Sequence, residues 1–208
     1  MADDYSDRPV SRASLMEIQA DREVIEEGYS FLDEKLVLLA QELLRRLETY
    51  EESRARFREL EQAAFGALAA AVGRHGLEGL QVYPPQGPPG GRLRWRDRDF
   101  LGVPLRDEAR LETEEDGERR PAVRPSAEAE ACAARFGELR DATAALAVEA
   151  ANLRRLLAEY ERTEQRARAL DNVVLPEVRE AERRMGERLT ESEQEEAVRI
   201  RLFAPGPG

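Results

Sequence analysis

The stretch Leu15–Leu43 reads LMEIQADREVIEEGYSFLDEKLVLLAQEL and decides the fold. Its apolar residues recur at alternating steps of three and four positions, and only Arg22 interrupts them. They are Leu15, Ile18, Ile25, Tyr29, Leu32, Leu36, Leu39 and Leu43. This spacing is typical of the seam of a left-handed coiled coil, so it predicts a helix that packs against another helix. Ser11 or Ser14 is expected to cap its start.

A second segment, Ser126–Phe203, carries a similar pattern. Its predicted seam consists of Cys132, Phe136, Leu139, Thr143, Leu146, Ala150, Leu153, Leu157, Tyr160, Ala167, Leu170, Val174, Val178, Ala181, Met185 and Leu189. Two long helices joined by a short middle segment pair most simply in antiparallel fashion, with facing residue numbers that add up to roughly 200. We therefore predict an all-α dominated fold, a long antiparallel two-helix coiled coil with a small β-hairpin head between the helices. At ~1.5 Å per residue, ~60 helical residues reach on the order of 90 Å, a shape suited to spanning or transmitting.

The first segment contains one predicted irregularity. After Leu43 the apolar spacing takes a second step of four residues, to Leu47, and such a stutter locally unwinds a supercoil. With this register Arg54 and Glu61 fall on the seam, so looser packing is expected there.

Pro176 is the only proline in the second segment. A proline inside a helix removes one backbone hydrogen bond and crowds the carbonyl four residues earlier, which here is Asn172. We expect a kink between these two residues.

The middle of the chain is rich in proline and glycine. Tyr83–Gly91 (YPPQGPPGG) predicts a turn-rich loop. Arginines alternate with Leu93, Trp95 and Asp97 through Arg92–Arg98, which predicts a strand, and Phe100–Leu105 (FLGVPL) predicts a second strand of a hairpin. Glu112–Glu118 is expected to be an acidic turn. The expected segments are a flexible start (1–13), a first helix (14–74), a loop and hairpin head (75–126), a second helix (127–203) and a flexible tail (204–208).

Composition limits the functions that this chain can have. Its formal net charge of −11 argues against a general nucleic-acid binder, which needs clustered basic surface. Its longest apolar runs are too short to cross a bilayer, and a single cysteine fits a reducing compartment. A cytoplasmic protein without direct membrane insertion is expected.

No enzyme site emerges from the sequence. His75 is the only histidine, so a histidine-rich metal site or a histidine-based triad is not expected. The GPPGG stretch lacks the lysine of a phosphate-binding loop, and Cys132 falls on an apolar seam position as a small filler. We predict no catalytic residues, no cofactor and no metal.

The segment 162–203 resembles the closing helix of the D subunit of the V-type and A-type rotary ATPases. The block ALDNVVLP is the specific part of this resemblance, and Ser11–Leu44 and Phe100–Leu105 also look like parts of that family. The matching residues of the closing helix are Thr163, Arg166, Ala169, Leu170, Asp171, Val173, Val174, Leu175, Pro176, Arg199 and Arg201. The chain departs from the family in its acidic first helix, where family members are often basic, and in Gln165 and Arg168.

The resemblance implies a non-catalytic central rotor axle. Such an axle couples ATP hydrolysis or synthesis in a hexamer of A and B subunits to rotation of a membrane ring. Its implied partners are the A and B subunits, the small F subunit of the stalk and the subunit that caps the ring, at the cytoplasmic side of the membrane. The implied contacts with the hexamer are Thr163, Arg166, Leu170, Asp171, Val174, Pro176, Arg199 and Arg201, and the implied contacts of the head with the F subunit or the ring cap are Trp95, Phe100 and Val103.

Two other interpretations stay open at this point. A free-standing antiparallel coiled-coil tether or scaffold would show the same heptads, although it has no reason to carry the block ALDNVVLP. The gamma subunit of an F-type ATP synthase is a further axle, but it needs a larger α/β domain between its helices than this middle segment provides.

Overall fold

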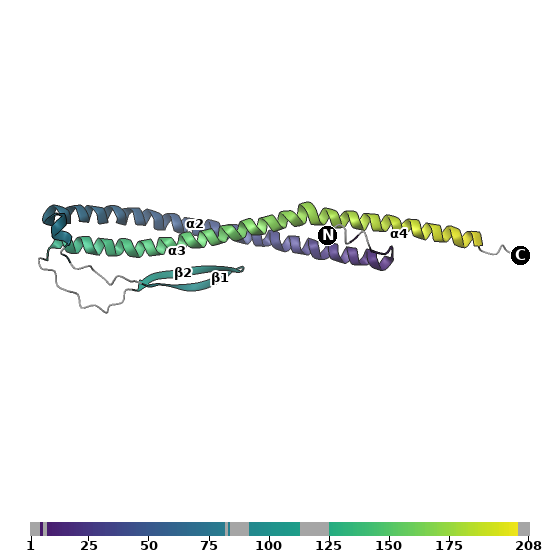
Figure 1. Ribbon diagram of the computed structural model, residues 1–208, viewed down its shortest axis with the longest axis horizontal. Coiled ribbons are helices and arrows are strands. Elements are labelled where there is room, and N and C mark those ends of the chain that lie inside the picture. Colours follow the sequence, from purple (N-terminus) through teal and green to yellow (C-terminus); the bar gives the residue numbers. More distant parts are fainter. Residues whose placement is uncertain (1–4, 6–7, 82, 84–91, 113–124, 204–208) are drawn as a thin grey trace. The chain divides into compact units, whose positions relative to one another are not determined.

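The computed structural model describes residues 5, 8–81, 83, 92–112 and 125–203. Its elements, which Figure 1 traces, are α2 (Arg12–Gln81), β1 (Arg92–Phe100), β2 (Val103–Glu112), α3 (Ala127–Ala169), a π-helical turn η1 (Leu170–Val174) and α4 (Leu175–Phe203). The chain forms two compact units, Met1–Leu38 with Tyr160–Gly208 and Leu39–Glu159, which we call the terminal unit and the hairpin unit. The predicted fold class is confirmed. Predictions for residues 84–91, 113–118 and 204–208 lie outside the described residues.

Local signals define the ends of the long helices. The hydroxyl of Ser11, rather than that of Ser14, caps α2 by accepting a hydrogen bond from the backbone N–H of Ser14 at 3.1 Å. The helical backbone of α2 is interrupted at Gly76, whose φ of 71° lies in the left-handed region that glycine adopts readily. Ser126 caps α3 through the backbone N–H of Ala129, at 3.2 Å.

The helices run antiparallel in each unit. In the terminal unit, Gln19 donates a hydrogen bond to Glu182 at 3.0 Å, and Tyr5, Ile18, Val178 and Met185 form the buried apolar cluster. In the hairpin unit, Phe65 meets Phe136 edge to face, with the ring centroids 6.1 Å apart. These facing residue numbers add up to roughly 200, as the sequence predicted.

The predicted stutter after Leu43 is wrong. Arg46 is only 4% exposed, whereas Leu47 is 42% exposed, so the alternation of three and four residues continues from Leu43 through the arginine. Arg54 is exposed, and Ser53 lies half-buried beside it. The register of the seam therefore stays constant, because a charged side chain occupies a position where an apolar one was expected.

Part of the predicted seam of the second helix also needs correction. Leu157 is 48% exposed and Phe136 is 36% exposed, whereas the adjacent Leu156 is fully buried. Asn152, which the apolar pattern passed over, is fully buried as well. Leu156 and Asn152 therefore face the interior of the unit, and Leu157 does not.

A π-helical turn immediately precedes Pro176. The backbone N–H of Leu175 bonds to the carbonyl of Leu170, five residues earlier, instead of to a residue four positions back. This wider turn provides room where the proline ring would otherwise crowd the carbonyl of Asn172. The helical path thus continues from α3 into α4, and the kink angle stays a prediction.

The hairpin is longer than predicted, and its turn lies elsewhere. Phe100 pairs with Val103 across the two-residue loop Leu101–Gly102, so Phe100 belongs to β1 and β2 extends to Glu112. Both loop residues have positive φ, 53° and 85°, as in the type I′ turns that match strand twist. A register shift between Arg94 and Arg96 accompanies the positive φ of 54° at Glu108.

Candidate functional site

Residues predicted to face a partner surround the π-helical turn in the terminal unit. Arg166, Asp171 and Pro176 are exposed, and Leu170 and Val174 are half-buried. Thr163 is only 1% exposed, so in this structure its side chain packs inside the unit. The turn therefore presents a mixed surface in which charged and apolar groups alternate.

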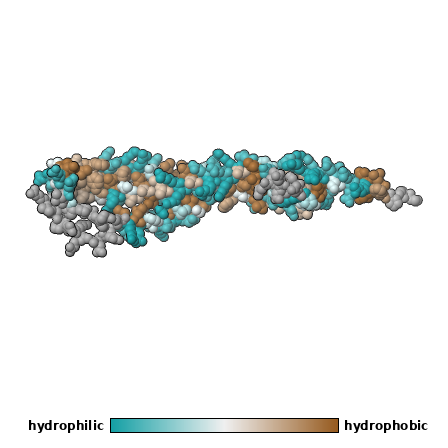
Figure 2. Space-filling model, in the orientation of Figure 1, coloured by the Kyte–Doolittle hydropathy of each residue, from teal (hydrophilic) through white to brown (hydrophobic). Residues whose placement is uncertain are grey.

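The end of α4 is the most exposed helical segment among the described residues. Every residue from 191 to 203 is exposed, including the predicted contacts Arg199 and Arg201. Glu193 accepts a hydrogen bond from Arg12, at the start of α2, and no described residue beyond Glu193 forms a hydrogen bond or ion pair with another element through its side chain. Figure 2 shows the resulting brown, apolar group of residues beside the grey tail. This group consists of Val198, Ile200, Leu202 and Phe203, which are 56%, 64%, 77% and 79% exposed.

The three predicted head residues differ in accessibility. Trp95 is 37% exposed and carries the guanidinium of Arg106 over its ring, 4.0 Å from the centroid. Phe100 is half-buried beneath Arg98, and Val103 is buried. Of the three, Trp95 offers the largest surface to another molecule, whereas Val103 supports the hairpin from within.

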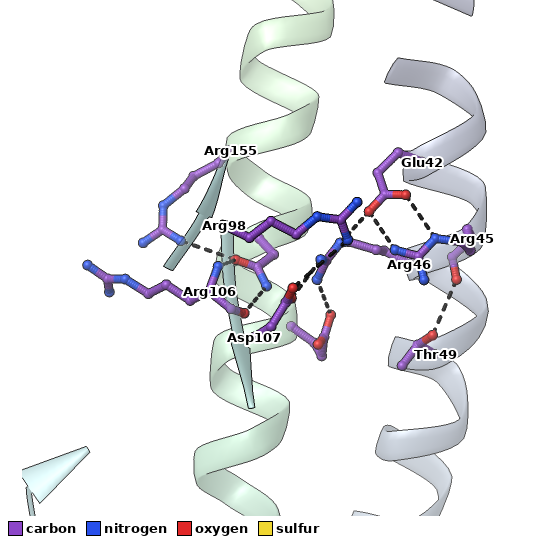
Figure 3. A network of polar contacts seen from close by, with 10 residues as sticks. Glu42, Arg45, Arg46, Thr49, Arg98, Arg106, Asp107 and Arg155 are labelled. Atoms are coloured by element: carbon purple, nitrogen blue, oxygen red, sulfur yellow. Dashed lines mark hydrogen bonds and ion pairs between the residues drawn. The ribbon is translucent and has the colours of Figure 1, made fainter. Parts of the chain in front are cut away.

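A buried arginine joins the hairpin to both helices of its unit (Figure 3). Arg46 of α2 donates hydrogen bonds to Glu42 on the same helix at 2.9 Å, to Asp107 of β2 at 2.7 Å and to Glu149 of α3 at 3.2 Å. The Arg46 and Glu42 side chains are 5% and 7% exposed, whereas Glu149 and Asp107 are 20% and 29% exposed. One cation thus holds three elements together through charge-assisted hydrogen bonds.

A buried asparagine binds the backbone of the same strand at Arg106. The side-chain oxygen of Asn152 accepts from the backbone N–H of Arg106 at 2.9 Å, and its side-chain nitrogen donates to the carbonyl of Arg106 at 2.6 Å. The amide therefore takes the place of a further strand at the outer edge of β2, as an exposed edge requires. Together Asn152 and Arg46 fix β2 on the helices of the hairpin unit.

The electrostatics of the network favour the charged forms of Glu42 and Arg46. Hydrogen bonds from Arg45, and also from Arg46, hold the pKa of Glu42 below its ordinary value against the opposing effect of burial. Burial alone would lower the pKa of Arg46, but its hydrogen bonds with Asp107 and Glu42 raise it. Glu42 and Arg46 are therefore held as a nearly buried ion pair.

Sequence reasoning missed Arg46 and Asn152. Arg46 follows Leu43 by three residues and precedes Tyr50 by four, so its heptad position was the available signal. No comparable signal marked Asn152, because its two hydrogen bonds depend on a strand 46 residues away in sequence.

The histidine and the cysteine, whose side chains often take part in catalysis, lie in surroundings typical of structural residues in this protein. His75 lies 2.6 Å from the hydroxyl of Ser126, the residue that caps α3. Burial raises the pKa of the Cys132 thiol, which disfavours the reactive thiolate. In the part of the chain that the structure describes, no group of three or more acidic, histidine or cysteine side chains could hold a metal ion. Among the described helices, none combines the length and the apolar character needed to span a bilayer.

Comparison with known proteins gives a consistent result. The sequence model of the family described as the D subunit of ATP synthase matches residues 14–204. The chain is 30% identical to a V-type ATP synthase D subunit of Anaeromyxobacter dehalogenans (strain 2CP-C) over 195 residues, which cover 93% of each chain. It is 28% identical to an A-type ATP synthase D subunit of Desulfurococcus sp. (strain SY) over 196 residues, which cover 92% of this chain and 90% of that relative.

Proposed function

We propose a function from one premise: this chain belongs to the family of ATP synthase D subunits. As its relatives are V-type and A-type ATP synthase subunits, it is a subunit of a complex of that kind. Within that complex it serves as the central rotor axle, which couples ATP hydrolysis or synthesis in a hexamer of A and B subunits to rotation of the membrane ring. It performs no chemistry itself and lies at the cytoplasmic side of the membrane.

The exposed end of α4 is the observation that carries this proposal. Successive residues of a helix are about 100° apart around its axis, so Val198 and Ile200 point in nearly opposite directions. Leu202 points within about 40° of Val198 and Phe203 within about 60° of Ile200, and all four side chains are more than half exposed. Apolar side chains that are exposed on opposite sides of one helix end, with Arg199 and Arg201 between them, mark an interaction surface that needs partners on more than one side. A ring of subunits that encloses the end of the axle provides such partners.

Coupling of ATP hydrolysis to rotation requires many contacts between the axle and the hexamer. To switch a two-state catalytic interface from 1:99 to 99:1 takes about 5.5 kcal/mol of differential binding. An exposed ion pair contributes only about 0–1 kcal/mol. The hexamer contacts therefore extend over the surface around η1 and the end of α4. Arg166 is exposed, so Arg166→Ala alone should leave most of the rotation-coupled ATPase activity intact.

Pro176 is a source of the asymmetric helix shape that a rotating axle requires. The π-helical turn before it departs from regular helical geometry inside an otherwise regular helix. If Pro176→Ala restores regular helix and uncouples ATP hydrolysis from rotation, this role is supported. Unchanged coupling in that variant would remove Pro176 from the mechanism.

The β1–β2 hairpin provides the second set of contacts with other subunits. Trp95, whose ring is covered by the guanidinium of Arg106, and Phe100 face the F subunit or the subunit that caps the ring. Val103 keeps the hairpin in shape from beneath.

Purification from the native host tests the assignment. Tagged full-length protein is expected to recover A, B and F subunits together with ATPase activity, as identified by mass spectrometry. A Leu202→Ser, Phe203→Ser variant should recover far less of the A and B subunits, whereas Leu44→Ser, which changes a 65% exposed leucine of α2, should recover them normally. Recovery of the chain alone would contradict the axle and favour a free-standing tether.

A further inference from the structure

The terminal unit carries a second apolar stripe that no described element of the chain covers. Val24, Phe31 and Leu38 follow one another at intervals of seven residues on α2 and are 67%, 66% and 46% exposed. Seven residues complete two helical turns to within about 20°, so the three side chains lie along one face. This face is distinct from the seam with α4, where Ile18 and Ile25 pack against Val178 and its neighbours. We call these three residues the outer stripe.

One edge of the outer stripe is acidic and unneutralised. Glu23, Glu27 and Glu34 border it on α2, and none of them forms a hydrogen bond or an ion pair with any described residue. Carboxylates on the seam side of the same helix behave differently. Glu26, for example, accepts a hydrogen bond from Arg179 of α4 at 2.9 Å. The free carboxylates thus lie where a partner, and not the chain itself, would supply the positive charge.

We propose that the outer stripe is a docking surface for a basic amphipathic helix of another subunit of the complex. The partner helix packs its apolar residues between Val24, Phe31 and Leu38, as the knobs of a coiled coil pack on a helix with heptad spacing. Its lysines or arginines lie opposite Glu23, Glu27 and Glu34. This inference rests on the proposed function only for the identity of the complex.

Charge excludes the simplest competing occupant. A second copy of this chain would bring its own acidic edge against the same carboxylates, and the chain already carries a net charge of −11. Like charges placed opposite one another oppose association. A basic helix is attracted both to the acidic edge and to the apolar stripe.

Site-specific photo-crosslinking in the intact complex tests the docking surface directly. A photoreactive phenylalanine analogue replaces Phe31 in one full-length variant and Val37 in the control, since Val37 is 52% exposed on another face of α2. We expect the probe at Phe31 to capture a peptide from a partner helix with lysine or arginine beside its apolar residues. Capture of an acidic peptide, of a loop, of a second copy of this chain or of nothing would overturn the proposal. If no other subunit co-purifies at all, it is the axle assignment that fails.

Two matched sets of variants separate the apolar and charged contributions. Phe31→Ser should weaken binding to the purified remainder of the complex by about tenfold or more, because the complex buries the phenylalanine ring, and Val37→Ser should not. Glu23→Gln, Glu27→Gln, Glu34→Gln should weaken binding and reduce its salt dependence. The control, Glu48→Gln, Glu51→Gln, Glu52→Gln, makes the same change in charge on exposed positions of α2. Equal losses in both charge sets would contradict a localised basic partner.

Discussion

Both units bury apolar side chains between their helices, but the terminal unit adds ion pairs that water reaches, whereas the hairpin unit adds an ion network centred on a buried pair. Arg12 and Glu193 of the terminal unit are 81% and 48% exposed, although their atoms lie 2.7 Å apart. Arg46 and Glu42 of the hairpin unit are 5% and 7% exposed. The difference follows from the hairpin, because a third element covers the interface and two helices alone leave their flanks open to water. Exposed pairs contribute little to stability, whereas removal of one partner of a buried pair is costly.

This contrast suggests that the two units differ in how firmly their elements are held. A hairpin fixed by Arg46 and Asn152 keeps Trp95 at a defined place on its own unit. The terminal unit, with a thin apolar core and an exposed end of α4, depends more on what surrounds it. Stability of the isolated chain should therefore respond strongly to substitutions in the network and weakly to substitutions of exposed pairs.

The largest effect is expected from Arg46→Leu. It leaves Glu42, Asp107 and Glu149 without their shared cation and should lower the free energy of unfolding of the hairpin unit by about 3–5 kcal/mol. Urea unfolding followed by the fluorescence of Trp95, the single tryptophan, measures it. Arg45→Leu is the control, because Arg45 is 56% exposed and its loss should cost at most about 1 kcal/mol. Equal effects of the two substitutions would end the distinction between the units.

Asn152→Leu should have the next largest effect. The substitution leaves the backbone N–H and carbonyl of Arg106 without partners, at a cost of about 1–3 kcal/mol for a buried group. Hydrogen exchange at Arg106 should accelerate in the full-length variant. Asn172→Leu, at an exposed position of η1, should leave that exchange unchanged. Slow exchange in Asn152→Leu would show that other contacts hold the hairpin.

The lowered pKa of the Glu42 carboxylate predicts that the stability of the hairpin unit depends on pH. Because the pKa of Glu42 is lowered in the folded state, its stabilisation is fully present above the ordinary pKa of about 4.3. It is lost as the pH falls through the lower folded pKa. Glu42→Gln should therefore be less stable than the unmodified chain by about 1–2 kcal/mol at neutral pH, and the two should converge in acid. A constant difference between pH 7 and acid, measured by urea unfolding, would contradict this, and Glu48→Gln serves as the exposed control.

The contrast between apolar contacts and buried polar contacts also explains which features could be predicted from the sequence. Heptad spacing predicted the antiparallel pairing, because apolar residues such as Ile18 and Val178 occupy their expected seam positions. It failed at Arg46, which looked like an interruption because its burial depends on carboxylates from three elements. It also misplaced the hairpin turn, since the register is set by the positive φ values of Leu101 and Gly102 rather than by apolar alternation. Apolar patterns are local, whereas buried polar groups need partners that are distant in sequence.

The smallest effect is expected for Arg12 and Glu193. A double-mutant cycle with Arg12→Ala and Glu193→Ala should give a coupling energy of about 0–1 kcal/mol, because both side chains are exposed and the pair is surrounded by water. In about 1 M salt, where the screening length falls to about 3 Å, the coupling should nearly vanish. A coupling that exceeds this range and persists in salt would mean that the terminal unit is held by specific charges, as the hairpin unit is. The start of α2 and the end of α4 would then have a fixed pairing of their own, and surrounding subunits would meet a rigid end instead of one that they order.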